Sequence, residues 1–279
     1  MSLLLFLLAQ AGPLVSPGAA PPLNLPTGIE RDRPARRPAA PVQAAIPAPS
    51  RLSACLEQAA SDPAAALVSA EDWLRVVKGA TRAEPLLCKG AALGGLDRWS
   101  EAESAFVEGR GIAAASDTAL RARLGAMAGN AALALTEPAR ALAVLDTVRE
   151  EARDLGDAGL AGDVALDRGR ALVALKRDGE AMMALDEARA SSPSNATAWL
   201  LSATLSRRTG KLAEAQERIA QAAVLAPADP EIGLEAGVIA VLDGREDAAR
   251  RSWQSVITIA PSSAAAQTAR SYLAQLEQP

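Results

Sequence analysis

From residue 51 onward, small and aliphatic residues gather in runs of about 12–16 residues that short polar turns separate. Patterns typical of strands are almost absent from this part of the chain. Asp62-Pro63 combines an N-cap residue with a proline at the first helical position, and Pro138 after Glu137 repeats the proline signal. We therefore predict an all-α region of similar-sized helices over 51–279.

Prolines end three of these runs at a regular interval. The stretch VLAPADP contains Pro227, and Pro193 and Pro261 lie 34 residues to either side of it. Since a proline cannot continue a helix, each one marks the end of a helix at the same place in a repeat. The aligned units are 162–195, 196–229 and 230–263.

Four columns of these units agree in residue size. The eighth position holds Gly169, Ala203 and Gly237, and the twentieth holds Ala181, Ala215 and Ala249. The twenty-fourth holds Leu185, Ile219 and Trp253, and the twenty-seventh holds Ala188, Ala222 and Val256. Small residues allow helix backbones to approach closely, and the bulky residue fills the space between helix pairs.

This order of small, small, bulky, small and proline resembles the tetratricopeptide repeat (TPR), a helix-turn-helix unit of 34 residues. Two earlier units fit the pattern with longer turns, over 83–121 and 122–161, and 51–82 resembles a degenerate first unit. Residues 264–277 would form a capping helix. The resemblance implies an α-solenoid of about five units plus the degenerate one.

An irregular helical bundle with accidental spacing is the alternative fold. Some positions depart from the TPR pattern, because the fourth position holds Ala165 and Gly233 and the eleventh holds Ser206 and Ala240. We expect the helices at these positions to pack less tightly than is usual for the family.

The first eleven residues contain an apolar run that is too short to span a bilayer, which takes roughly 20 residues. Ala9-Gln10-Ala11 follows with the small-x-small pattern of a signal-peptidase site, although no Lys or Arg precedes the run. We predict a signal peptide over 1–11 with cleavage after Ala11, and hence a periplasmic or secreted protein. The alternative is an uncleaved apolar N-terminus or a misplaced start codon, with a cytoplasmic protein.

Residues 12–50 hold ten of the eighteen prolines. This composition predicts a disordered, extended linker ahead of the helical region. The linker carries a basic cluster made of Arg31, Arg33, Arg36 and Arg37. The cluster either meets an anionic surface or keeps the linker solvated.

The amino-acid composition excludes several classes of catalytic and metal-binding site. The chain has no histidine and two cysteines, so His-dependent nucleophile systems, His-based zinc sites and four-thiolate zinc sites are excluded. The net charge of −4 disfavours nucleic acid as a partner. No phosphate-binding loop or acid–base constellation is present. We predict no enzyme activity, no metal and no cofactor.

The two cysteines, Cys55 and Cys88, lie 33 residues apart, which is nearly one repeat. In the TPR interpretation both lie on the first (A) helices of neighbouring units, so they come within reach of each other. An oxidising compartment would permit a disulfide between them. The alternative is two small, inert residues in the core.

The TPR resemblance implies a concave face, lined by the A helices, that holds an extended or helical peptide. Its groove-facing positions are about the second, fifth, ninth, twelfth, thirteenth and sixteenth of each unit. The candidates are Arg98, Asn130, Arg170, Arg177, Leu200, Thr204, Arg207, Arg208, Lys211 and Arg245. Because arginine grips carboxylates, this set predicts an acidic or C-terminal peptide as ligand. Alternatively, these cations favour helix dipoles and solvate turns.

The carboxylate clamp of chaperone-binding TPR proteins is not supported. Asn130 matches one of its positions, but the following units offer Asp167, Thr197 and Leu201. The sequence therefore favours a non-catalytic, exported TPR adaptor or assembly factor of a bacterial cell envelope. A structural module that self-associates without a foreign ligand is the alternative function.

Overall fold

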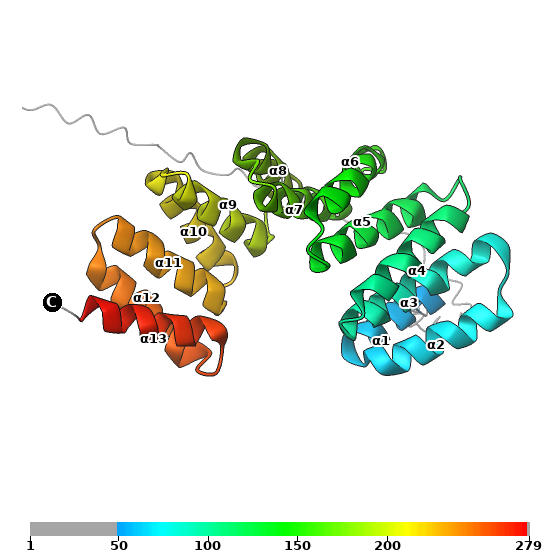
Figure 1. Cartoon of the computed structure of the whole chain (residues 1–279), viewed down its shortest axis with the longest axis horizontal. Coiled ribbons are helices and arrows are strands. Elements are labelled where there is room, and N and C mark those ends of the chain that lie inside the picture. Colours follow the sequence, from blue (N-terminus) through cyan, green and yellow to red (C-terminus); the bar gives the residue numbers. More distant parts are fainter. Residues whose placement is uncertain (1–48, 278–279) are drawn as a thin grey trace, which may run out of the picture. The chain divides into compact units, whose positions relative to one another are not determined.

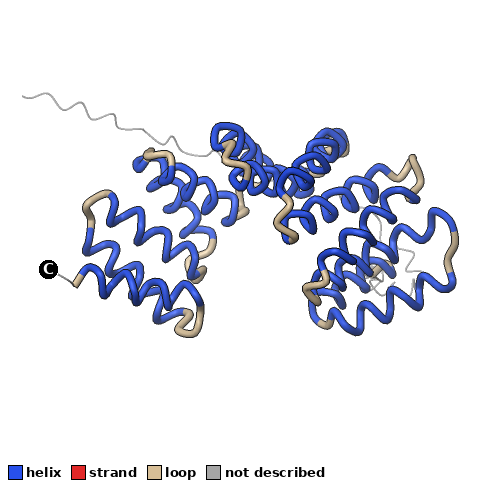
Figure 2. The backbone as a smooth tube through the Cα atoms, in the orientation of Figure 1, coloured by secondary structure: helices blue, strands red, loops and turns tan. Residues whose placement is uncertain are grey.

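The computed structural model describes residues 49–277, so the predicted signal peptide (1–11) and nearly all of the predicted linker (12–50) lie outside the described residues. Figure 2 shows helices joined by loops, without strands, in this described region. The helices are α1 (Arg51–Ser61), α2 (Pro63–Val76), a 3-10 turn (Gly79–Arg82), α3 (Ala83–Gly95), α4 (Trp99–Ile112), α5 (Thr118–Ala134), α6 (Pro138–Asp154), α7 (Ala158–Ala174), α8 (Asp178–Ser191), α9 (Ala196–Arg208), α10 (Leu212–Leu225), α11 (Pro230–Leu242), α12 (Glu246–Ile259) and α13 (Ala264–Leu276).

These helices form six helix-turn-helix pairs and one final helix. Each helix packs against the next one along the chain, as the labels in Figure 1 allow the reader to follow. The odd-numbered helices, called A helices below, also contact one another from α1 to α7 and from α9 to α13. The even-numbered helices, called B helices below, form the second half of each pair. The predicted all-α solenoid of stacked helix pairs is confirmed.

The small and bulky columns pack against each other within each pair. A Cβ atom added to Gly129 would lie 2.6 Å from Cγ of Leu145, and one added to Gly169 would lie 2.8 Å from Cδ2 of Leu185. Both leucines are fully buried. The small residue of the A helix therefore makes room for the bulky residue of its own B helix, which explains why the two columns recur together.

Trp253, the last residue of the bulky column, also satisfies the hydrogen-bonding capacity of its indole N–H. Its indole Nε1 donates a hydrogen bond of 3.1 Å to the carbonyl oxygen of Leu234 on α11. A buried indole N–H usually needs such a partner. The side chain is 3% exposed, so the tryptophan contributes its full apolar area to the core.

Helix α13 covers this end of the core, as predicted for a capping helix. Ala265, Ala266 and Ala269 are buried beside Trp253, whose ring centroid lies 5.1 Å from that of Tyr272. The outward residues of α13 include Gln267, Arg270 and Gln275, which are exposed. A polar outer face is what a terminal helix of a repeat array needs in water.

The predicted approximate unit boundaries, near 121/122 and 161/162, fall a few residues inside α5 and α7. The side chain of Asp117 accepts a hydrogen bond of 3.1 Å from the amide of Leu120, and Asp157 does the same for Leu160 at 3.0 Å. These N-caps start both helices earlier than the repeat phase indicates. The extra residues therefore lengthen helices, and the turns stay short.

The turns between A and B helices share one backbone feature. In five of them, one residue has a positive φ, and these residues are Asp97, Thr136, Lys176, Gly210 and Gly244. Thr136 has a φ of 59°, which is costly for a β-branched residue. Glycine occupies the corresponding position of two later turns.

We expect Thr136→Gly to stabilise the protein by about 1 kcal/mol, since relief of the left-handed backbone exceeds the entropy cost of glycine. Urea unfolding monitored by circular dichroism measures this difference. Thr209→Gly is the matched control, because Thr209 has a φ of −92° and makes hydrogen bonds through its hydroxyl to Leu205 and Ser206. That variant should lose stability, and the opposite ranking would contradict the assignment of strain to Thr136.

Candidate functional site on the A-helix face

The surface to which α1, α3, α5, α7, α9 and α11 contribute is called the A-helix face here. It contains two adjoining cavities. The first hollow has a volume of about 550 Å³ and lies among α1, α3, α5 and α7. The second hollow has about 210 Å³ and lies mainly between α7 and α9. Arg170 lines both of them.

The first hollow has an apolar floor built by four different A helices. Leu56 comes from α1, Leu87 from α3, Met127 from α5, and Leu160 and Leu166 from α7. Leu56, Met127 and Leu160 are only half-buried, so they keep apolar surface in contact with water. A segment that covered them would gain from burial of this surface.

Polar groups on one wall of the first hollow are already engaged with one another. The Asn130 amide donates a hydrogen bond of 3.0 Å to Oδ2 of Asp167, and Arg170 forms an ion pair of 2.8 Å with Oδ1 of the same carboxylate. Asp167 is 8% exposed. Two predicted groove residues, Asn130 and Arg170, therefore lie in the site, but both satisfy a buried carboxylate that links α5 to α7.

Asp163 lies on the same wall and has no ion pair within 4.0 Å among the described residues. Partial desolvation raises the pKa of its carboxyl, and the negative charges of Asp167 and Asp157 raise it further, while Arg170 lowers it. Asp163 was not predicted from the sequence. It nevertheless occupies the second position of unit 162–195, which is one of the groove-facing positions. The repeat pattern could therefore have identified Asp163 as a groove residue.

The second hollow contains two of the predicted residues besides Arg170. Thr204 and Arg208 project from α9 beside Leu201, opposite Val173 of α7. Arg208 is exposed, and within residues 49–277 no carboxylate forms an ion pair with it. The guanidinium of Arg208 is therefore available to an external anion.

The other predicted cations do not line either hollow. Four of them are N-cap residues of B helices, and each pairs with a carboxylate close by in the sequence. The pairs are Arg98–Glu101 (2.6 Å), Arg177–Glu180 (2.6 Å), Lys211–Glu214 (3.5 Å) and Arg245–Asp243 (2.7 Å). Hydrogen bonds from the arginines lower the pKa of Glu101 and of Glu180. These four residues therefore form local ion pairs at the turns between A and B helices.

Two further predicted residues pack within the array. The guanidinium of Arg207 forms an ion pair of 2.6 Å with Glu235, whose side chain is 12% exposed, and this contact joins α9 to α11. Leu200 is half-buried in an apolar cluster with Ile219 and Ile232. Both residues hold neighbouring units together.

Three solved structures have the same arrangement of helix pairs. PilW, a widely conserved type IV pilus biogenesis factor, has 19% sequence identity and a TM-score of 0.62, with 79% of this chain and 99% of PilW covered. TTC0263, a thermophilic TPR protein in Thermus thermophilus, has 19% identity and a TM-score of 0.54, with coverages of 69% and 97%. MamA has 15% identity and a TM-score of 0.50, with coverages of 61% and 93%.

The chain has the TPR fold. By sequence, it matches no protein-family model and no curated protein. At these identities the structural likeness establishes the architecture alone, and the binding properties of this TPR array depend on its own side chains.

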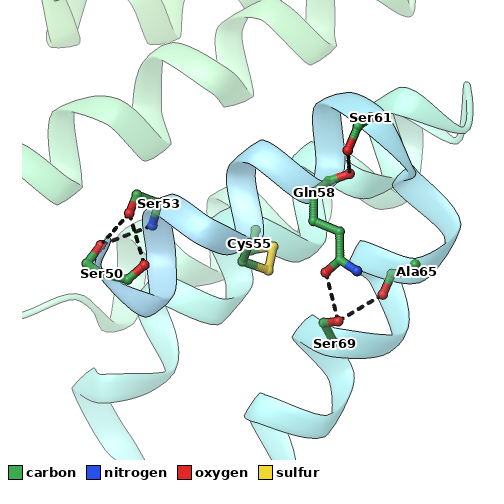
Figure 3. The surroundings of a disulfide bond; sticks show 8 residues. Ser50, Ser53, Cys55, Gln58, Ser61, Ala65 and Ser69 are labelled. Atoms are coloured by element: carbon green, nitrogen blue, oxygen red, sulfur yellow. Dashed lines mark hydrogen bonds between the residues drawn. A yellow bond between two sulfur atoms is a disulfide. The ribbon is translucent and has the colours of Figure 1, made fainter. Parts of the chain in front are cut away.

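A disulfide joins the first two units of the TPR array. Cys55 on α1 and Cys88 on α3 are bonded, with their Cα atoms 6.0 Å apart, and both residues are buried. Figure 3 shows the bond at Cys55 and, nearby, a hydrogen bond of 2.9 Å from the Ser69 hydroxyl to the Gln58 side chain. The closed loop contains all of α2, so the first helix pair is tied to the second.

Two kinds of feature are absent from residues 49–277. None of their helices combines the length and the apolar character that a membrane crossing requires. In the same region, no cluster of three or more Cys, Asp or Glu residues is arranged to hold a metal ion.

Proposed function

We propose that this TPR protein is a non-catalytic adaptor or assembly factor of the bacterial cell envelope that binds a peptide or protein segment on its A-helix face. The observation that carries the proposal is the half-buried apolar floor of the first hollow, to which four A helices contribute. Repeat solenoids bind partners on such extended faces. The second hollow continues the site along α7 and α9.

Three observations support a location in the cell envelope. The sequence predicts a signal peptide over 1–11, the Cys55–Cys88 bond needs an oxidising compartment in most bacteria, and the fold is like that of PilW, a pilus biogenesis factor. Sequencing the N-terminus of the mature protein tests export. Gly12 as first residue supports export, whereas Met1 or Ser2 contradicts it.

In this proposal the acidic part of the ligand, or its C-terminal carboxylate, binds at the second hollow. Arg208 is the cation there that has no carboxylate partner in the described chain, and Thr204 beside it supplies a hydroxyl. Arginine binds carboxylates in a fork geometry. Two other predicted cations, Arg170 and Arg207, are already held by Asp167 and Glu235.

We expect Met127→Glu to reduce partner capture at least about tenfold, because a carboxylate in the apolar floor has to be desolvated when the ligand binds. Crosslinking in the native cell, followed by identification and quantification of bound proteins, measures the effect. Met183→Glu is the matched control, since Met183 is 65% exposed on the B helix α8. Both variants should keep the helical circular dichroism of the wild type.

Equal capture by the Met127→Glu and Met183→Glu variants would contradict binding on the A-helix face. Size-exclusion chromatography with light scattering addresses self-association. If crosslinking finds only copies of this chain, and the wild type is a stable oligomer that Met127→Glu dissociates, the alternative function replaces the adaptor.

A further inference from the structure

The first hollow has an excess of negative charge. Its five charged lining residues are Asp157, Asp163, Asp167, Arg123 and Arg170. Both cations are already engaged, because Arg170 pairs with Asp167 at 2.8 Å and Arg123 lies 3.7 Å from Asp157. Asp163 is the remaining carboxylate, and it has no ion pair with any described residue.

The position of Asp163 makes this surplus charge costly in the free protein. Asp163 is exposed, and two other carboxylates, Asp157 and Asp167, lie near it and repel its negative charge. A cation from a ligand would stabilise the Asp163 carboxylate by offsetting the repulsion from these two neighbours. A ligand carboxylate at the same place would add a like charge to three existing ones.

The apolar floor lies directly beside this carboxylate. Leu160 and Leu166 belong to the same helix as Asp163, and Met127 faces them from α5. A ligand that satisfied both features would carry a positive charge close to an aliphatic or aromatic side chain.

We infer that the first hollow binds a basic, apolar segment of another polypeptide, with a Lys or Arg side chain at Asp163 and an aliphatic or aromatic neighbour on the floor formed by Leu56, Met127 and Leu160. The inference rests on the proposed function and names the chemistry of its ligand. The charge preference is opposite to that of Arg208 in the second hollow. A ligand that spans both hollows is therefore basic at one end and acidic at the other.

Selection from a random peptide library displayed on phage tests this charge preference with the full-length protein. The wild type should select peptides in which Lys or Arg stands close to Leu, Ile, Met or Phe. Synthetic copies of these peptides should bind the Asp163→Lys variant at least about tenfold more weakly, since the charge at the site is reversed. Glu217→Lys is the control, because it makes the same charge change at an exposed position of α10.

Three results would overturn the inference: selection of no peptide, selection without a preference for basic residues, or equal loss of binding in the Asp163→Lys and Glu217→Lys variants. The Met127→Glu variant distinguishes a wrong charge assignment at Asp163 from a wrong proposed function. If it abolishes peptide binding while Asp163→Lys does not, peptides bind on the A-helix face and only the charge assignment is wrong. If neither variant changes binding, both proposals are wrong.

The pH dependence of peptide affinity gives a second test of the role of Asp163. A bound cation favours the ionised carboxylate, so the affinity of a selected basic peptide should fall as the pH falls through the raised pKa of Asp163. The Asp163→Asn variant should bind more weakly at neutral pH and lose less affinity on acidification. An identical pH dependence in wild type and variant would contradict the role of Asp163.

Discussion

Gly90→Ala is expected to destabilise the protein by about 2–3 kcal/mol, a cost typical of an overpacked core. The added Cβ would lie 2.6 Å from Cδ1 of Phe106, which is 1% exposed and cannot move into solvent. The ring would have to leave its preferred rotamer or α3 would have to separate from α4. Urea unfolding followed by circular dichroism measures the loss. Gly237→Ala should behave similarly, because its Cβ would lie 2.5 Å from Cδ1 of Trp253.

Gly111→Ala is the control for this prediction. Gly111 lies near the end of α4, and no atom stands within 4 Å of the position that its Cβ would take. The same substitution should therefore leave stability unchanged or raise it by up to about 1 kcal/mol, through helix propensity alone. If both variants changed stability by the same amount, the close approach of α3 and α4 at Gly90 would be wrong.

Removal of the disulfide by Cys88→Ala is expected to cost about 3–4 kcal/mol, given the separation of 33 residues between the two cysteines. The loss should concentrate in α1 and α2, because a terminal unit of a repeat array has a neighbour on one side only. Hydrogen exchange measured helix by helix shows where protection is lost, and thermal unfolding gives the total.

Reduction of the wild type provides the matched comparison. A reductant should lower the protection of α1 and α2 in the wild type and leave the Cys88→Ala variant unchanged. If the amides of α1 and α2 exchange at the same rate with and without the bond, the crosslink does not hold the first helix pair in place.

The fold was predictable because every helix pair packs in the same way, so residues of a given size recur at the same position of each repeat. Gly169 must be small where Leu185 is large, and this requirement returns in the next units, so the sequence shows it without coordinates. Helix starts follow a different rule. Asp117 and Asp157 begin α5 and α7 through local side-chain hydrogen bonds that need not keep the phase of the repeat, so these helices start a few residues before the boundaries drawn from the period.

The site was less predictable than the fold. The repeat positions selected both Arg208, which lines the second hollow, and Arg207, whose charge is satisfied by Glu235, 28 residues away in the sequence. Ion pairing between units depends on how neighbouring helices stack, and no local pattern records it. The same holds for Asp163, because the role proposed for it depends on the carboxylates around it and on the absence of an ion-pairing cation among the described residues.

The bond between Cys55 and Cys88 makes the two ends of the helical array unequal. Helix α1 is attached to α3 covalently, whereas α13 is held at the other end by noncovalent contacts: the side chains that it buries and a hydrogen bond of 3.1 Å from Arg250 of α12 to the carbonyl oxygen of Leu276. In a linear array each unit depends on its neighbour, so loss of structure proceeds inward from whichever end opens more readily. Under oxidising conditions that end is α13, and the helices around the first hollow are the last to be reached.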